Sequence, residues 1–148
     1  MKIFFGDIVH TWNNKATWTS PLNIGYISSY ANKKLKEDGI NIKFKLFKNP
    51  QLMLDAIRDE KPDVVALSHY VWNASINKKI FDFTKSILPK CLNVGGGPQF
   101  TNHNYNEEEA IKFFKKNINC DFYILNQGEK GFYQLSKSFY LSNFNIDE

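Results

Sequence analysis

The sequence predicts a doubly wound α/β fold, in which helices cover both faces of a five-stranded parallel sheet. Three observations predict it. Short apolar segments alternate with segments of helical periodicity along the whole chain. The apolar segment 63–70 (DVVALSHY) is unbroken, as in a central parallel strand covered on both faces. The length of 148 residues is that of one domain, so we assign 1–148 to a single unit.

Apolar segments are expected to form the strands. The first is 2–9 (KIFFGDIV), and the second, 42–47 (IKFKLF), alternates apolar residues with lysine as an edge strand does. The third, 63–70, is followed by the shorter segments 91–94 (CLNV) and 121–125 (DFYIL). With right-handed crossovers the expected strand order is 2-1-3-4-5, an arrangement of the flavodoxin or Rossmann-like kind.

The first two helices have boundary signals in the sequence. Pro21 suits a first helical turn, and Gly39 provides a C-terminal stop for that helix. Asn49 is expected to cap the second helix, with Pro50 at its first position and its end before Pro62. Each helix therefore connects two expected strands as a crossover.

The last three helices are predicted from periodicity and charge. Segment 73–88 has the most regular apolar spacing in the chain, at Ile76, Ile80, Phe83 and Ile87. Segment 107–116 (EEEAIKFFKK) begins with glutamates and ends with lysines, which suits the helix dipole. The final helix is expected to follow NQGE and to carry Phe132, Leu135 and Phe139.

The composition favours a soluble, cytoplasmic protein. The net charge of +4 comes from dispersed lysines and a single arginine, Arg58, whereas nucleic-acid binders more often cluster Arg and Lys among aromatics. No apolar stretch approaches the ~20 residues that span a bilayer, and the start of the chain does not fit a signal peptide. Cys91 and Cys120 have no metal-type spacing and are expected to be small buried residues. We expect neither a nucleic-acid nor a membrane partner.

Distinctive residues follow the expected strands rather than the helices. They lie in the loop after the first strand, which contains Trp12, in the segment 68–73 (SHYVWN), in the glycine run 95–97 and in the segment 126–129 (NQGE). In open parallel sheets, ligands bind outside the carboxyl ends of the strands, where the strand order reverses. The sequence therefore predicts a binding edge.

The glycine run at the end of the fourth strand has two interpretations. Without a Cβ atom, Gly95, Gly96 and Gly97 allow a flat ligand or a phosphate to approach the backbone closely. The same residues are also expected where a tight turn relieves strain at a strand end. No G-x-G-x-x-G or G-x-x-x-x-G-K-S/T phosphate motif accompanies them.

Three ordered motifs resemble a known family. The segment KPDVVALSHYVWN, then VGGGPQF, then CDFYILNQGEKGF are similar to the cobalamin-binding domain of the cobalamin-dependent radical-SAM enzymes, and PLNIGYISSYA resembles that family's first helix. In that family the strands end in Ser-x-Tyr-x-Trp-Asn, Gly-Gly-Pro-Glu and Gly-Glu-Gly-Glu-x-x-Phe. The resemblance covers most of the chain and implies cobalamin as the cofactor.

The resemblance also implies roles for individual residues. One group would line the lower face of the cofactor or its nucleotide tail: Ser68, Tyr70, Trp72 and Asn73. A second group would let the tail approach the backbone or close the far side: Gly96, Gly97, Pro98, Gly128 and Glu129. Trp12 and Gly95 complete the candidate cofactor-binding set. Alternatively, Tyr70 and Trp72 are packing aromatics, and Glu129 is a favourable charge in a first helical turn.

The chain departs from the family pattern at two places. Gln99 stands where glutamate is common, and Asn126-Gln127 replaces Gly-Glu, which implies weaker or altered binding. The mutase-type Asp-x-His-x-x-Gly motif is absent, because two residues separate Asp7 from His10. We therefore do not assign His10 as an axial ligand, and the resemblance implies that many family members need no such histidine.

The chain lacks the residues for radical-SAM chemistry. It has only two cysteines and no C-x-x-x-C-x-x-C motif for an iron-sulfur cluster. We therefore expect no catalytic residue and no catalysis from this chain alone. The resemblance implies a radical-SAM domain in cis or in trans, with the iron-sulfur cluster and S-adenosylmethionine, and a chain that is the N-terminal part of a longer protein.

Two other functions remain open on the sequence. A nucleotide-binding, flavin-binding or receiver-like domain has the same fold, although a receiver should carry an acidic cluster around an aspartate at a central strand end. The third expected strand ends in LSHY, without such an aspartate. A degenerate interaction module that kept the fold and lost the ligand is the other possibility.

Overall fold

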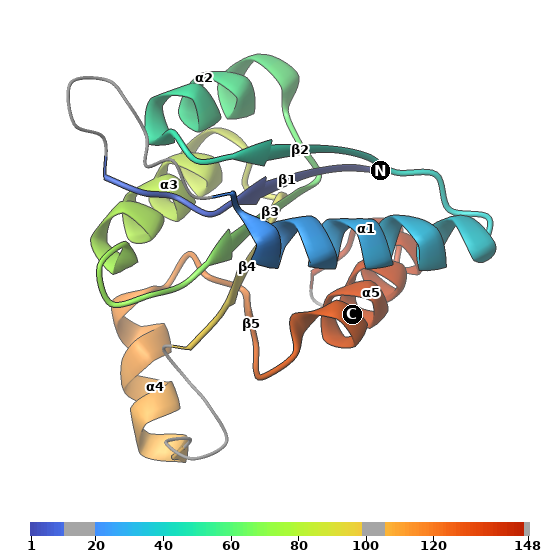
Figure 1. Ribbon diagram of the computed structural model, residues 1–148. Helices are drawn as coiled ribbons and strands as arrows, with labels where there is room; N and C mark the ends of the chain where they lie inside the picture. The colour runs from blue at the N-terminus through green and yellow to red at the C-terminus, as the bar shows by residue number, and fades with distance from the viewer. Residues whose placement is uncertain (11–19, 99–105, 147–148) are drawn as a thin grey trace.

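The computed structural model describes residues 1–10, 20–98 and 106–146. Its strands form one parallel sheet in the order β2-β1-β3-β4-β5, which confirms the predicted fold class and strand order (Figure 1). The strands are β1 (Lys2–Gly6), β2 (Lys43–Phe47), β3 (Val64–Ser68), β4 (Leu92–Gly96) and β5 (Phe122–Ile124).

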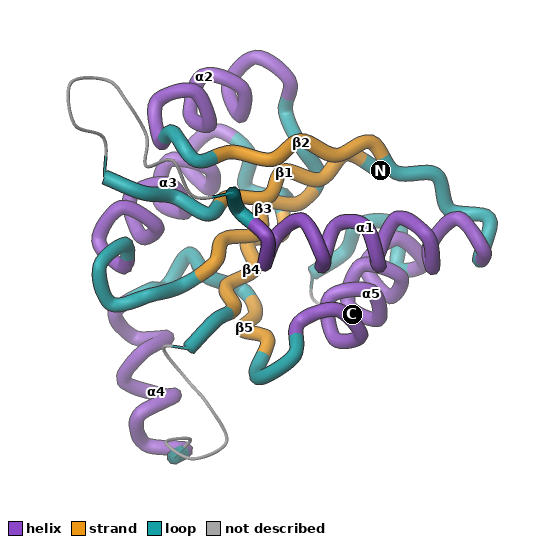
Figure 2. The backbone as a smooth tube through the Cα atoms, viewed as in Figure 1, coloured by secondary structure: helices purple, strands orange, loops and turns teal. Residues whose placement is uncertain are grey.

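The helices divide into two layers on the sheet (Figure 2). One hydrophobic cluster joins α1 and α5 to one face of the sheet, and a second joins α2, α3 and the single buried residue of α4 to the other face. The helices are α1 (Leu22–Glu37), α2 (Pro50–Glu60), α3 (Ala74–Ile87), α4 (Glu107–Lys116) and α5 (Gly128–Leu141). Among the described residues, none of them is long and apolar enough to cross a membrane.

The central strand β3 is buried on both faces of the sheet. Every residue of β3 is buried, and alternate residues enter the two clusters, with Val64 and Ala66 in one and Val65 and Leu67 in the other. This alternation follows from the two-residue repeat of a strand. β2 is an exposed edge strand, as its alternating lysines predicted.

The first strand is shorter than the sequence predicts. β1 ends at Gly6 and not at Val9, because β3, its other neighbour, pairs with it only as far as Leu67. The apolar run continues beside the end of β2, where Asp7 donates a backbone hydrogen bond to Phe47 and Val9 donates one to Lys48, the residue after the strand. Ile8 is fully buried, so the apolar pattern reflects burial beyond the strand.

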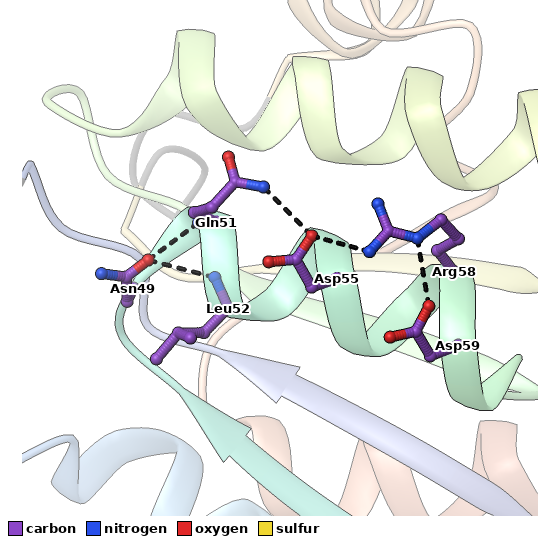
Figure 3. Close-up of polar contacts among 6 residues, drawn as sticks. All are labelled: Asn49, Gln51, Leu52, Asp55, Arg58 and Asp59. Atoms are coloured by element: carbon purple, nitrogen blue, oxygen red, sulfur yellow. Dashed lines mark hydrogen bonds and ion pairs between the residues drawn. The ribbon is translucent and has the colours of Figure 1, made fainter.

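Helix α2 begins as the sequence predicts (Figure 3). The Asn49 side chain accepts hydrogen bonds from the backbone N–H groups of Gln51 and Leu52, at 2.8 and 3.1 Å. Along the exposed face, Asp55 accepts from Gln51 and from Arg58. The cap satisfies donors that a helix leaves unpaired at its start.

Replacing Asn49 by alanine should lower the free energy of unfolding by about 1 kcal/mol, because two N–H groups lose their acceptor. Urea denaturation followed by circular dichroism measures the change. Asn49→Ser keeps an acceptor oxygen and should retain most of the stability. Equal losses in the serine and alanine variants would contradict a capping role.

Helix α3 packs most of its predicted apolar face on the sheet, since Ile80 is buried and Ile76 and Phe83 are partly buried against the same cluster. Ile80 and Phe81 are buried, but so are Asn77 and Thr84, whereas Ile87 is 41% exposed. The polar pair is accommodated because Asn77 Nδ2 donates to the Ser68 carbonyl and Thr84 Oγ1 donates to the Ile80 carbonyl. Apolar periodicity therefore located this helix and most of its buried face, but not the polar residues Asn77 and Thr84 that share it.

Candidate functional site

A cavity of about 250 Å³ opens at the carboxyl ends of β1, β3 and β4. It lies where the strand order reverses, which is the position that the fold favours for a ligand. The N-terminal parts of α1 and α5 form its sides, and apolar side chains predominate in its wall. The residues that contribute from these helices and strands include Phe5, Ile24, Ile27, Ala66, Val94, Ile124 and Phe132.

The turn after β3 is fixed by a buried hydrogen-bond network around Asn73. Asn73 is fully buried, and its Nδ2 donates to the carbonyl oxygens of Ile8 and Ser68 at 3.1 and 3.0 Å. Its Oδ1 accepts the backbone N–H of Tyr70 at 2.8 Å. Asn77 adds a further hydrogen bond to the Ser68 carbonyl. The network positions Ser68 and Tyr70 at the cavity.

Tyr70 links this turn to α1. Its hydroxyl accepts a hydrogen bond from Asn23 Nδ2 at 3.1 Å, and its ring stacks on Trp72 with centroids 4.4 Å apart. Partial burial, with a smaller contribution from Asp7, raises the pKa of Tyr70, so the phenol is neutral at physiological pH. The Ser68 hydroxyl donates to Asp7 Oδ1 at 2.6 Å. These groups give the cavity a polar rim beside its apolar wall.

The three glycines of the run have different surroundings. A Cβ on Gly95 would lie 2.9 Å from the Tyr123 ring on the far face of the sheet. A Cβ on Gly96 would meet only Ile124, at 3.4 Å or more, although Gly96 lines the cavity. Gly97 has a φ of +133°, and its Cβ would lie 2.6 Å from the His69 carbonyl oxygen. A side chain on Gly96 would therefore extend toward the cavity, whereas Gly97 is required by the turn itself.

The segment before α5 closes the opposite side of the cavity. Asn126 has a φ of +61°, a left-handed conformation that asparagine tolerates better than most residues. Gln127 is the residue before the helix, and Gly128 with Glu129 begins it. A Cβ on Gly128 would lie 2.8 Å from Ile27 of α1, so glycine lets the two helices approach closely.

Most of the predicted site residues are brought together, and some are not. The cavity is lined by Ser68, Tyr70, Gly95, Gly96, Gly97, Gly128 and Glu129. Three others lie close by without lining it: Trp72 is 61% exposed, Asn73 is buried in the turn, and Pro98 is exposed. Trp12 and Gln99 lie outside the described residues.

Sequence reasoning missed the contribution of α1. Asn23, Ile24, Tyr26 and Ile27 line the cavity, and none was a candidate site residue. The available signal was Pro21, which marks the helix start and places the first turns of this helix at the carboxyl edge. Tyr26 is 67% exposed, which an aromatic residue at a binding rim explains better than core packing does.

The histidines and cysteines do not form a reactive centre in the described part of the chain. His69 is 1% exposed, and burial lowers its pKa to about 4. Burial raises the pKa of Cys91 and of Cys120 to about 12, so both thiols stay protonated. His10 Nε2 lies 2.9 Å from the Trp72 carbonyl oxygen. Among the described residues, no three His, Cys, Asp or Glu side chains gather as a metal site would need.

The chain is similar to part of two curated methyltransferases, whereas no protein-family model matches it. The cobalamin-dependent radical SAM methyltransferase TokK of Streptomyces tokunonensis is 36% identical over 85 residues, 57% of this chain and 11% of that protein. The 2-(S-pantetheinyl)-carbapenam-3-carboxylate methyltransferase of Streptantibioticus cattleyicolor is 30% identical over 94 residues, 60% of this chain and 13% of that protein. The chain thus spans a small part of these relatives, and the resemblance read from the motifs is supported over that part.

A solved structure shares the fold. The receiver domain of NtrC4 from Aquifex aeolicus superposes with a TM-score of 0.50, at 16% identity, over 94% of this chain and 96% of that domain. At this identity the likeness shows the fold alone. In this chain β3 ends at Ser68 and not at an aspartate. The described residues therefore lack the acidic cluster that a receiver domain is expected to carry at this strand end.

Proposed function

We propose that this chain binds cobalamin at the carboxyl edge of its sheet and presents it to a radical-SAM domain. The observation that carries the proposal is the cavity at the reversal point of the sheet, which is lined by residues from all three motifs of the resemblance. The partial similarity to the two methyltransferases supports the same cofactor class.

The residues at the cavity fit part of such a cofactor. A volume of about 250 Å³ is at or below the ~300–1,000 Å³ typical of pockets that enclose a whole small ligand, so only part of a large cofactor can enter. The resemblance implies that the part that enters is the nucleotide tail of the cofactor. The backbone at Gly96 is open to the cavity, and the apolar wall suits a flat aromatic group. Cobalt would supply the reactivity when the cofactor is bound, and the protein would orient the cofactor and shield it from water.

Each part of the edge has a distinct task in this proposal. Asn73 holds the turn after β3 in one conformation, and Asn23 fixes the hydroxyl of Tyr70. The apolar side chains of α1 and α5 exclude water from the inner end of the cavity. Glu129 and the Tyr70 hydroxyl are left at the rim to contact polar groups. No described residue is assigned a proton-transfer or nucleophilic role.

Replacing Gly96 by leucine should weaken cobalamin binding at least about 10-fold, because the new side chain occupies the cavity. The measurement is titration of hydroxocobalamin against the protein by visible absorbance, followed by desalting to detect retained corrin. Ser29→Leu, which adds the same side chain on the exposed surface of α1, is the matched control and should bind as the parent does.

The proposal has two independent tests. Failure of the parent chain to retain any corrin, with its circular dichroism intact, would contradict the cofactor assignment. A C-x-x-x-C-x-x-C motif encoded downstream in the same gene, or in an adjacent one, is expected for the radical-SAM partner. Its absence from both would contradict the partner but not cobalamin binding.

A further inference from the structure

Helix α4 and the turn that follows it carry an exposed apolar face, with opposite charges at the two ends of the helix. Ile111 is 48% exposed, Phe114 37% and Ile118 75%, and Ala110 lies beside them in a shallow surface groove. Glu107 borders the groove at the start of the helix, and Lys115 borders it near the end. We call these six residues the α4 face.

The α4 face is not used within the described part of the chain. Phe113 is the only buried residue of α4, and it packs on the rings of His69 and Tyr123 on another side of the helix. Figure 1 shows α4 extending away from the sheet, unlike the helices that lie along it. A ten-residue helix is marginally stable alone, so an apolar stripe at helical spacing indicates a covering partner.

The charges at the ends of the face select its partner. Lys112 already pairs with Glu108 and Glu109, at 2.9 and 3.1 Å. Glu107 and Lys115 have no ion pair within the described residues and lie about two helical turns apart. A second copy of the helix in antiparallel orientation brings Glu107 of each chain toward Lys115 of the other. Parallel pairing would bring like charges together, and the helix dipoles also favour the antiparallel arrangement.

We propose that two copies of this chain associate through their α4 faces, with the helices antiparallel about a two-fold axis. Such an interface is self-complementary, because each copy supplies one apolar stripe, one acidic end and one basic end. The face is small beside the ~1,200–2,000 Å² of a stable complex, so the dimer is a weak one that forms as concentration rises. This surface is separate from the cavity and does not depend on cobalamin binding.

Sedimentation equilibrium of the whole chain tests the proposal, with concentrations up to about 0.5 mM because weak interfaces need them. The average mass should rise from monomer toward dimer across that range. Ile111→Lys should keep the helix content but weaken association at least 10-fold, because it places a charge at the centre of the stripe.

Charge exchange tests the contact, and the single variants test its orientation, because parallel pairing would leave the number of like-charge pairs unchanged. Glu107→Lys and Lys115→Glu should each weaken self-association, since each homodimer then places like charges together. An equimolar mixture of the two should associate as strongly as the parent, because both opposite-charge pairs are restored. Lys79→Glu, the same charge change on an exposed residue of α3, should leave association unchanged.

Three results would overturn the proposal. One is a parent chain that stays monomeric throughout the concentration range. Another is a mixture of the charge variants that associates no better than either alone, which would place the contact elsewhere. Protection of α4 only when a radical-SAM partner is added would likewise assign the face to that partner.

Discussion

Gly97→Ala should lower the free energy of unfolding by about 3 kcal/mol or more. Gly97 has a φ of +133°, which L side chains rarely adopt, and the added Cβ would lie 2.6 Å from the carbonyl oxygen and 3.0 Å from the nitrogen of His69. Both atoms belong to backbone. The His69 N–H also donates to the Gly96 carbonyl oxygen at 2.6 Å, so the segments around Gly97 and His69 cannot move apart without losing that bond. The backbone strain at the positive φ and the displacement of the His69 backbone therefore both lower the stability of the variant.

Gly25→Ala is the matched control in urea denaturation. Gly25 lies in α1, and a Cβ there would meet nothing within 4 Å. The same chemical change should raise stability by about 0.5–1 kcal/mol, because alanine has the higher helix propensity. A Gly97→Ala variant as stable as the parent would show that the turn between β4 and the following loop can relax.

The sequence predicts the fold well because local signals and topology agree. The apolar run of β3, the cap of α2 and the lysine alternation of β2 each identify an element that the structure confirms. The errors lie in what a linear pattern does not contain. β1 ends early because its pairing with β3 stops at Leu67, and the buried face of α3 includes a polar residue, Asn77, which hydrogen-bonds the Ser68 carbonyl.

The location of the cavity is predictable from the sequence, and the position of each residue around it is not. The carboxyl ends of parallel strands lie at the same edge of the sheet, so the motifs that follow β3, β4 and β5 lie close together at that edge. Whether a residue faces the ligand or supports the turn depends on side-chain direction. Asn73 resembles a ligand contact in sequence but is fully buried in its turn, and of the glycines Gly96 opens toward the cavity while Gly97 satisfies backbone geometry. The tight-turn interpretation therefore applies to Gly97, whereas the close approach of a ligand at Gly96 stays a prediction.

Stability should fall by about 3 kcal/mol as the pH is lowered from 6.5 to 4, because of His69. Its imidazole lies against Phe113 and Tyr123, and Nδ1 has no hydrogen-bond partner among the described residues. Burial lowers the pKa from 6.5 in the unfolded chain to about 4 in the folded one. Between these values the unfolded state binds a proton that the folded state does not. The contribution is therefore complete above pH 6.5 and lost toward pH 4.

Urea denaturation at half-unit pH steps isolates this contribution. The pKa of Asp38 is lowered by hydrogen bonds from Lys137 and Tyr133, and that of Asp82 mainly by Lys78, so loss of these exposed interactions belongs to still lower pH. His69→Phe, which removes the titrating group in an aromatic setting, should flatten the slope between pH 4 and 6.5. A parent chain with constant stability across this window would mean that His69 accepts a proton without leaving its position, and hence that Nδ1 gains a partner on protonation.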